Sequence, residues 1–168
     1  MKINIAPYNN EWPLAFETIK KEIKKNIFDN NIIIEHIGST SVKNLDSKPI
    51  IDILIGVKSD DLDKYIDPIK NLGYIYIKKY ETETPNRRFF FFEKNKKRIA
   101  HIHLVKKNSK WFKRHILFRN ELRANKIIRK KYQQLKYSLS KKEWKNSNEY
   151  ADAKTKFIRS VETMLKYD

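Results

Sequence analysis

The chain has 168 residues, 40% of them hydrophobic, and 37 Lys and Arg against 20 Asp and Glu give a formal net charge of +17 at pH 7. It contains no cysteine and no run of about 18 apolar residues, which excludes disulfides, thiolate metal sites, cysteine nucleophiles and a membrane-spanning helix. Because the N-terminus also lacks the apolar stretch of a secretory signal, we expect a single cytoplasmic domain, residues 1–168, without a membrane partner.

Three elements are predicted before residue 58. Apolar residues at helical spacing predict an amphipathic helix over residues 11–27, with Pro13 in its first turn: Trp12, Phe16, Ile19, Ile23 and Ile27. Apolar, β-branched runs at 31–37 and 49–57, ending near Gly38 and Gly56, predict two interior strands joined by a loop or short helix.

The middle of the chain predicts one further helix and three strands. Residues 59–72 form an acidic stretch that we expect to be helical and to end at Gly73. Strands are expected over 74–80, 87–93 and 98–105, the last two paired as a hairpin around the polar turn at 94–97. In the run Phe89-Phe90-Phe91-Phe92, strand alternation favours packing on both faces of a sheet over a platform for stacking nucleic-acid bases.

From Ser109 onward the apolar spacing is helical. It predicts helices over residues 111–122, 127–139 and 150–164, the last capped by Asn146 or Ser147. No linker or repeat interrupts the chain. We therefore expect an α+β fold, a mixed β-sheet with an N-terminal helix and a C-terminal helical bundle, in which 1–105 is the sheet-containing core and 106–168 a basic helical half.

Most of the positive charge lies in that helical half. Residues 1–105 hold 18 Lys and Arg against 14 Asp and Glu, whereas residues 106–168 hold 19 against 6. Two interpretations remain open. The excess either faces an anionic partner such as a nucleotide or RNA, or is solvated surface in a chain rich in Lys, Asn and Ile.

The segment at 35–57 has the order of residues that a nucleotide site requires. An apolar strand ends at Gly38-Ser39-Thr40, and Lys48 leads into a second strand that carries Asp52. Backbone N–H groups and a hydroxyl at a glycine turn suit phosphate, and a carboxylate on a rigid strand suits its cation.

Blocks along nearly the whole chain carry a family resemblance: PY at 7–8 with Trp12, HIGST at 36–40, KPIIDIL at 48–54, LGY at 72–74, RFF at 88–90, HIHL at 101–104, FRN at 118–120 with LRAN at 122–125, Tyr132 with LK at 135–136, and Tyr150 with AK at 153–154 and FI at 157–158. In these blocks the chain resembles the GrpB family of the nucleotidyltransferase superfamily. The resemblance implies a nucleotidyltransferase-like fold and a metal-dependent transfer of an NMP from an NTP.

The resemblance also exposes a departure from the superfamily pattern. Superfamily members usually carry two acids at alternate positions of one strand, and a third on a neighbouring strand. Here Asp52 is followed by Leu54 on the same face of the strand. His101 and His103, also at alternate positions, would complete a catalytic and metal site with Asp52, for Mg²⁺, Mn²⁺ or, with its nitrogen ligands, Zn²⁺. The alternative is that the histidines bond phosphate or substrate, or act as a base.

Further residues are assigned by charge and spacing. Besides Gly38, Ser39, Thr40 and Lys48, the predicted nucleotide-binding residues are His36, Arg88, Arg98, Arg119 and Arg123. His36 is either near the phosphates or a core histidine. Arg119 and Arg123 form a helical stripe with His115 that either grips phosphate or pairs with acids. On the predicted acceptor side are two pairs one turn apart, Tyr132 with Lys136 and Tyr150 with Lys154.

Two functional hypotheses follow. The first is a nucleotidyltransferase that uses an NTP and an unidentified acceptor, a small molecule or a macromolecule. The second is a catalytically impaired member that serves as a nucleotide sensor, or that binds RNA through its basic C-terminal helices. The absence of an acid at Leu54 favours the second.

Overall fold

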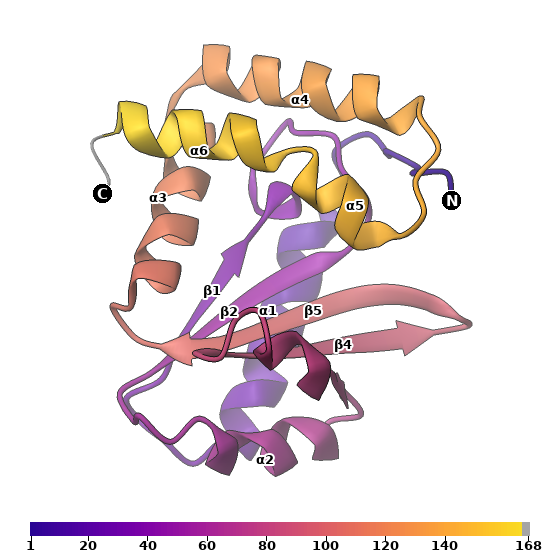
Figure 1. The fold of residues 1–168 in the computed structure, drawn as a ribbon. Coiled ribbons are helices and arrows are strands. Elements are labelled where there is room, and N and C mark those ends of the chain that lie inside the picture. Colours follow the sequence, from indigo (N-terminus) through magenta and orange to yellow (C-terminus); the bar gives the residue numbers. More distant parts are fainter. Residues whose placement is uncertain (166–168) are drawn as a thin grey trace.

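A mixed β-sheet forms the centre of the computed structural model, which describes residues 1–165 (Figure 1). Within that range five strands follow the order β1-β2-β5-β4-β3. The central pair β2 and β5 is parallel and the outer pairs are antiparallel. The strands are β1 (Ile33–Ile37), β2 (Ile51–Val57), β3 (Ile75–Tyr76), β4 (Arg87–Lys94) and β5 (Lys97–Lys106).

One face of the sheet carries the larger hydrophobic core. The helices α1 (Glu11–Asn26) and α2 (Ile66–Asn71) pack against it, behind and below the strands in Figure 1. Alternate residues of β2, among them Ile53 and Ile55, meet Phe16, Ile23 and Phe90 in this core. By strand alternation, the residues between them, including Asp52, point to the opposite face.

That opposite face is covered by the C-terminal helices, which lie above the sheet in Figure 1: α3 (Lys110–Ala124), α4 (Lys126–Ser140), α5 (Ser147–Asp152) and α6 (Thr155–Met164). Helix α3 packs on the sheet through Phe112, which meets Ile37, Leu54 and Val105. A second contact joins Leu122 and Tyr132 to Val42 and Leu45 of the loop between β1 and β2. The C-terminal helices are therefore held over one part of this face only.

The α+β fold with its N-terminal helix, mixed sheet and C-terminal helices is confirmed, and so is the hairpin of β4 and β5. Three predictions of extent were wrong. The helix expected over 59–72 is limited to α2, Ile66–Asn71, which follows a 3₁₀ turn at Asp63–Tyr65. The strand expected over 74–80 is limited to Ile75–Tyr76, because Lys78–Glu81 turns into a 3₁₀ helix. The helix expected over 150–164 is divided at Ala153 and Lys154 into α5 and α6, with Asn146 as the cap of α5.

No helix within residues 1–165 is long and apolar enough to cross a membrane.

Candidate functional site

The pairing of β2 with β5 sets Asp52 directly opposite His101, with His103 two residues further along the same strand. The Asp52 Oδ1 lies 3.1 Å from His101 Nδ1 and 3.8 Å from His103 Nε2. One ligand atom from each residue lies within 4.8 Å of the others. The three side chains predicted to form a metal site therefore converge on one point of the sheet; they are called the triad below.

Charge and burial set the protonation of the triad. Burial alone would raise the pKa of Asp52, but the hydrogen bonds and charges of His101 and His103 outweigh it, so the pKa lies well below its usual range. Burial lowers the pKa of His103 to about 4, despite the neighbouring Asp52. At pH 7 the triad thus presents a carboxylate and a neutral imidazole, the forms in which these groups bind cations.

Gly38 brings the turn after β1 against the triad. Its φ is +69°, and a Cβ atom at this position would lie 2.5 Å from Asp52 Oδ2. Only glycine avoids both the left-handed strain and that overlap. The Ser41 hydroxyl donates to the Gly38 carbonyl at 2.6 Å and fixes the turn. Gly38 is therefore required for the close approach of backbone and carboxylate.

The triad fits a divalent cation. Its donor set of one oxygen and two nitrogens suits Mn²⁺ and Zn²⁺ as well as Mg²⁺. His101 faces Asp52 through Nδ1, and its Nε2 is buried without a hydrogen-bond partner in the described chain. Arg87 Nη1 faces His103 Nδ1 at 3.4 Å. When His103 binds a cation through Nε2, its proton lies on Nδ1. The Arg87 guanidinium is also a hydrogen-bond donor and therefore has to turn away from Nδ1.

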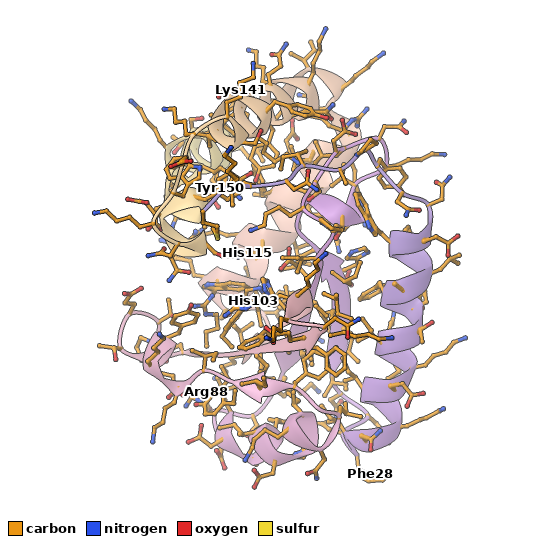
Figure 2. All side chains as sticks on the ribbon, turned by 90° about the vertical axis from the view of Figure 1, so that its right-hand side faces the viewer. Phe28, Arg88, His103, His115, Lys141 and Tyr150 are labelled. Carbon is orange, nitrogen blue, oxygen red and sulfur yellow. The ribbon has the colours of Figure 1, made fainter. Side chains whose placement is uncertain are left out.

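A cavity of about 430 Å³ opens over the triad, between the sheet and the C-terminal helices. This volume is in the range of small-molecule sites. Besides the triad, six residues predicted from the sequence line it: Ser39, Lys48, Arg98, Lys136, Tyr150 and Lys154. Figure 2 shows Tyr150 on the helical layer and His103 on the sheet, the two layers that enclose the cavity.

The lysines of the cavity lie in an unusual environment. The Nζ atoms of Lys154 and Lys48 lie 4.3 Å and 5.5 Å from the centre of the Tyr150 ring. Burial lowers the pKa of Lys154 to about 8 and that of Lys136 to about 7, in spite of nearby carboxylates. Burial also raises the pKa of Tyr150 to about 12. The cavity therefore holds ammonium groups at a cost in solvation, which an anion would offset.

His36 and Thr40 lie on the core side of the sheet, and neither lines the cavity. The His36 ring stacks on Phe16 of α1 with centroids 4.7 Å apart. Its Nε2 lies 3.0 Å from the Thr40 hydroxyl, which donates to the Ile50 carbonyl. Burial lowers the pKa of His36 to about 4. Of the two interpretations left open for His36, the structure matches the satisfied core histidine.

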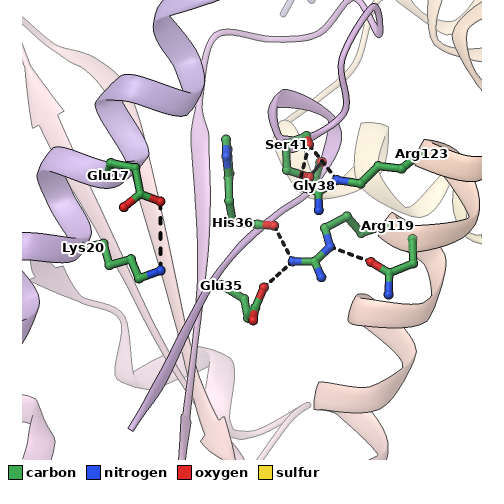
Figure 3. A network of polar contacts seen from close by, with 9 residues as sticks. Glu17, Lys20, Glu35, His36, Gly38, Ser41, Arg119 and Arg123 are labelled. Atoms are coloured by element: carbon green, nitrogen blue, oxygen red, sulfur yellow. Dashed lines mark hydrogen bonds and ion pairs between the residues drawn. The ribbon is translucent and has the colours of Figure 1, made fainter.

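The arginine stripe of α3 faces β1 and the following turn rather than the cavity (Figure 3). Arg119 Nη1 donates to Glu35 Oε2 at 2.6 Å and to the His36 carbonyl at 2.9 Å. Arg123 donates through Nε and Nη2 to the Ser41 carbonyl at 3.0 and 2.8 Å. The helical spacing was right, but α3 packs so that these two guanidinium groups meet protein acceptors.

Two other predicted site residues lie outside the cavity lining. Arg88 pairs with Asp63 at 2.6 Å and Glu81 at 3.4 Å. Tyr132 is buried in the helical layer between the rings of Phe118 and Phe157. Arg88 is thus paired with acids of the protein, and Tyr132 is packed among aromatic rings.

Arg87, which the sequence reasoning passed over, does line the cavity. Its guanidinium carbon lies 5.5 Å from the Phe89 ring and 5.6 Å from the Trp111 ring, and its Nε is buried without a hydrogen-bond partner in residues 1–165. Strand alternation from Phe89 is the signal that places Arg87, and not Arg88, on this face. No motif marks the other lining residues that were missed: Ser47, Ile50, Tyr80, Glu83, Phe89, Ser147, Asn148, Ala151 and Asp152.

The sequence of residues 2–164 matches the family described as GrpB protein. The chain belongs to the GrpB family. It is 36% identical to the UPF0157 protein YqkA of Bacillus subtilis, covering 98% of this chain but 48% of YqkA. It is 28% identical to the glutamate-rich protein GrpB of Alkalihalophilus pseudofirmus, covering 95% of this chain and 94% of that protein. The chain therefore spans about half of one GrpB relative and nearly all of another.

Two solved structures place the fold. The crystal structure of the conserved protein GrpB from Enterococcus faecalis matches with a TM-score of 0.83 and 32% identity over 96% of both chains. A structure of the Cid1 poly(U) polymerase with Mg 3′-dATP bound matches with a TM-score of 0.50 over 77% of this chain and 43% of that one. At 9% identity the second likeness shows the fold alone. This GrpB chain has a nucleotidyltransferase-like fold.

Proposed function

We propose that this GrpB chain is a metal-dependent nucleotidyltransferase that moves an NMP from an NTP to a hydroxyl or phosphate of a small-molecule acceptor. The observation that carries the proposal is the convergence of Asp52, His101 and His103 on the floor of a cavity lined by lysine and arginine. The nucleotidyltransferase-like fold supports the same reaction class.

The triad would hold a divalent cation, Mg²⁺ or Mn²⁺ with Zn²⁺ as an alternative. When bound, such a cation screens the phosphates and lowers the pKa of the acceptor oxygen. In the transfer, that oxygen bonds to the α-phosphorus as the bond to the β-phosphate oxygen breaks. Pyrophosphate leaves with the electron pair, and the proton of the acceptor passes to solvent.

The remaining groups of the cavity position the reactants. Ser39, next to Gly38 on the same turn, lines the cavity together with Asp52 and would contact phosphate there. Lys48 and Arg98, together with Arg87, offset the charge of the triphosphate, because cations held at a site reduce the repulsion between phosphate and incoming nucleophile. Lys136, Tyr150 and Lys154 line the acceptor side.

The structure gives the second hypothesis one specific support. Leu54, at the position of the second acid, is fully buried beside Ile37, Val105 and Phe112. A chain that lacks this carboxylate holds fewer metal ligands, as a nucleotide sensor would. For an RNA-binding variant of this hypothesis, residues 126–140 carry no acid, and Lys126, Lys130 and Lys131 are exposed.

Binding and turnover separate these functions. ATP, GTP, CTP and UTP are titrated with Mn²⁺ or Mg²⁺ into wild type, Asp52→Asn and the control Asp67→Asn, whose carboxylate is exposed on α2. Pyrophosphate release is then assayed with a metabolite extract. We expect metal-dependent binding that is lost only in Asp52→Asn, and pyrophosphate only when extract is present. Binding without turnover in any extract would favour the sensor, and the absence of NTP binding would refute the proposal.

A further inference from the structure

Four side chains from separate segments form one wall of the cavity, called the lysine wall: Lys48 before β2, Lys136 of α4, Tyr150 of α5 and Lys154 at the start of α6. The break between α5 and α6 is what turns Lys154 toward the Tyr150 ring. Tyr150 lies on the helical layer, across from His103 on the sheet (Figure 2), and Lys48 lies in the loop before β2.

The ammonium groups of the lysine wall have no ion-pair partner among residues 1–165. Lys48 and Lys154 contact the Tyr150 ring, and Lys136 donates to the Asp46 carbonyl. Two other cations of the helical layer are paired: the buried Arg119 with Glu35, and the half-buried Arg114 with the buried Glu162. Lys136 is buried, Lys48 and Lys154 are half-buried, and the only carboxylates that act on their charges, Asp46 and Asp52, form no ion pair with them, so these lysines suit a bound anion.

Tyr150 adds an independent sign. Its hydroxyl is buried and has no hydrogen-bond partner in the described chain, and Tyr150 is one of the residues that line the cavity. Buried hydroxyls are almost always bonded, so an orphaned one marks the position of a missing partner. An oxygen-rich anion would accept from this hydroxyl and from the ammonium groups around it.

We propose that the lysine wall binds a phosphate group carried by the acceptor, so that the acceptor is a small phosphorylated molecule rather than a neutral alcohol. This inference rests on the proposed function. The phosphate is a group for recognition and takes no part in bond making. Lysines suit it, because their ammonium groups act as separate point charges around a tetrahedral anion.

The distribution of the cations supports the acceptor over the donor. Arg87 and Arg98 belong to the same sheet as the triad and face the cavity from its side, where a metal-bound triphosphate would lie. A neutral acceptor would leave the three lysines with Asp46 and Asp52 as nearby carboxylates and with no bound anion. A phosphate bound beside Lys154 would raise its pKa from about 8 toward the usual value of a lysine.

The first arm of the test uses inorganic phosphate and glycerol 3-phosphate, without nucleotide or metal, by calorimetry at constant ionic strength. The variants are Lys154→Gln and Tyr150→Phe, with Lys156→Gln as the control, because Lys156 is exposed on α6. We expect glycerol 3-phosphate to bind wild type, Lys154→Gln to weaken it about 10-fold or more, and Tyr150→Phe to weaken it about 3–10-fold. Lys156→Gln should match wild type.

Unfolding temperatures of the three variants show whether each is folded, and Tyr150→Phe, which removes one oxygen, keeps the test valid if Lys154→Gln unfolds. No binding of either phosphate compound by wild type at millimolar concentration would overturn the inference. Equal loss of affinity in Lys156→Gln would also overturn it, because the affinity would then come from general surface charge.

The second arm distinguishes the two possible sources of the phosphate. Glycerol 3-phosphate is titrated into wild type saturated with NTP and Mn²⁺. Simultaneous binding supports the acceptor site, whereas competition assigns the lysine wall to the donor triphosphate and overturns the inference. Binding of glycerol 3-phosphate by a protein that binds no NTP would refute the nucleotidyltransferase proposal and leave the phosphate site standing.

Discussion

Two groups of buried cations in this GrpB chain differ in what they contact. On α3, Arg119 is 7% exposed, pairs with Glu35 and donates to the His36 carbonyl. In the cavity, Lys136 is 2% exposed, and its ammonium group contacts a backbone carbonyl and no carboxylate. Basic residues at a similar depth in this protein therefore have different roles. A cation with a carboxylate partner stabilises the fold, and one without an ion-pair partner is available for a ligand.

The largest effect is expected from removing a paired cation. Arg119→Met leaves Glu35 without its partner and the His36 carbonyl without its donor. We expect the free energy of unfolding in urea to fall by about 3 kcal/mol, toward the lower limit for a broken buried pair because Glu35 is partly exposed. NTP affinity of the folded variant should not change. Weakened NTP binding with unchanged stability would reverse the assignment of Arg119.

The second prediction concerns the carboxylate around which the cavity cations are arranged. Gly38→Ala sets a Cβ atom where Asp52 Oδ2 lies, and the carboxylate has to move. We expect Mn²⁺ affinity to fall about 10–100-fold, as when a supporting residue of a metal ligand is altered. The matched control is Gly73→Ala, which has a positive φ but lies away from the triad against Phe92. Equal losses of Mn²⁺ affinity in the two variants would show backbone strain alone.

Removing a cation that has no ion-pair partner among residues 1–165 should change the free energy of unfolding in the direction opposite to that of Arg119→Met. The pKa of Lys136 is about 7 in the folded protein and near 10.5 when unfolded, so the unfolded chain binds more protons between these values. The stability of wild type should therefore rise relative to Lys136→Met as pH increases through this window. We expect the difference between the two to shift by about 1–2 kcal/mol from pH 7 to pH 9 in urea unfolding. If the free energies of unfolding of wild type and Lys136→Met ran parallel with pH, Lys136 would not be an ammonium group held at a cost in the folded protein.

The smallest effect is expected at Arg123, which is exposed and bonded only to the Ser41 carbonyl. Arg123→Ala should lower the free energy of unfolding by about 1 kcal/mol, since the carbonyl can turn to water. A loss of unfolding free energy as large as that of Arg119→Met would show that the different burial of the two arginines does not determine how much each stabilises the fold.

The elements of this chain were predictable because their signals are local. Apolar spacing from Trp12 to Ile27 identified α1, and the polar turn at 94–97 identified the hairpin. The triad could also be predicted from the sequence. Asp52 stands alone on a buried strand, and alternate histidines on the next strand require only the correct pairing to meet it.

What could not be predicted depends on tertiary packing. Alternation puts Arg87 and Arg88 on opposite faces, but which face holds the cavity depends on where α3 and α5 pack. Likewise, helical spacing grouped Arg119 with Arg123 and left open whether the stripe meets a ligand or β1. The turn of Lys154 into the cavity required the break after α5, which no proline or glycine marks.

The central claim is that Asp52 and its two histidines hold a divalent cation beneath the cavity. Electron paramagnetic resonance of free Mn²⁺ tests it directly, in a titration of wild type, Asp52→Asn and the control Asp67→Asn with NTP present. We expect wild type and Asp67→Asn to remove the free Mn²⁺ signal to the same extent. Asp52→Asn should bind Mn²⁺ more than about 100-fold more weakly. Binding of Mn²⁺ by Asp52→Asn as tightly as by wild type would contradict it.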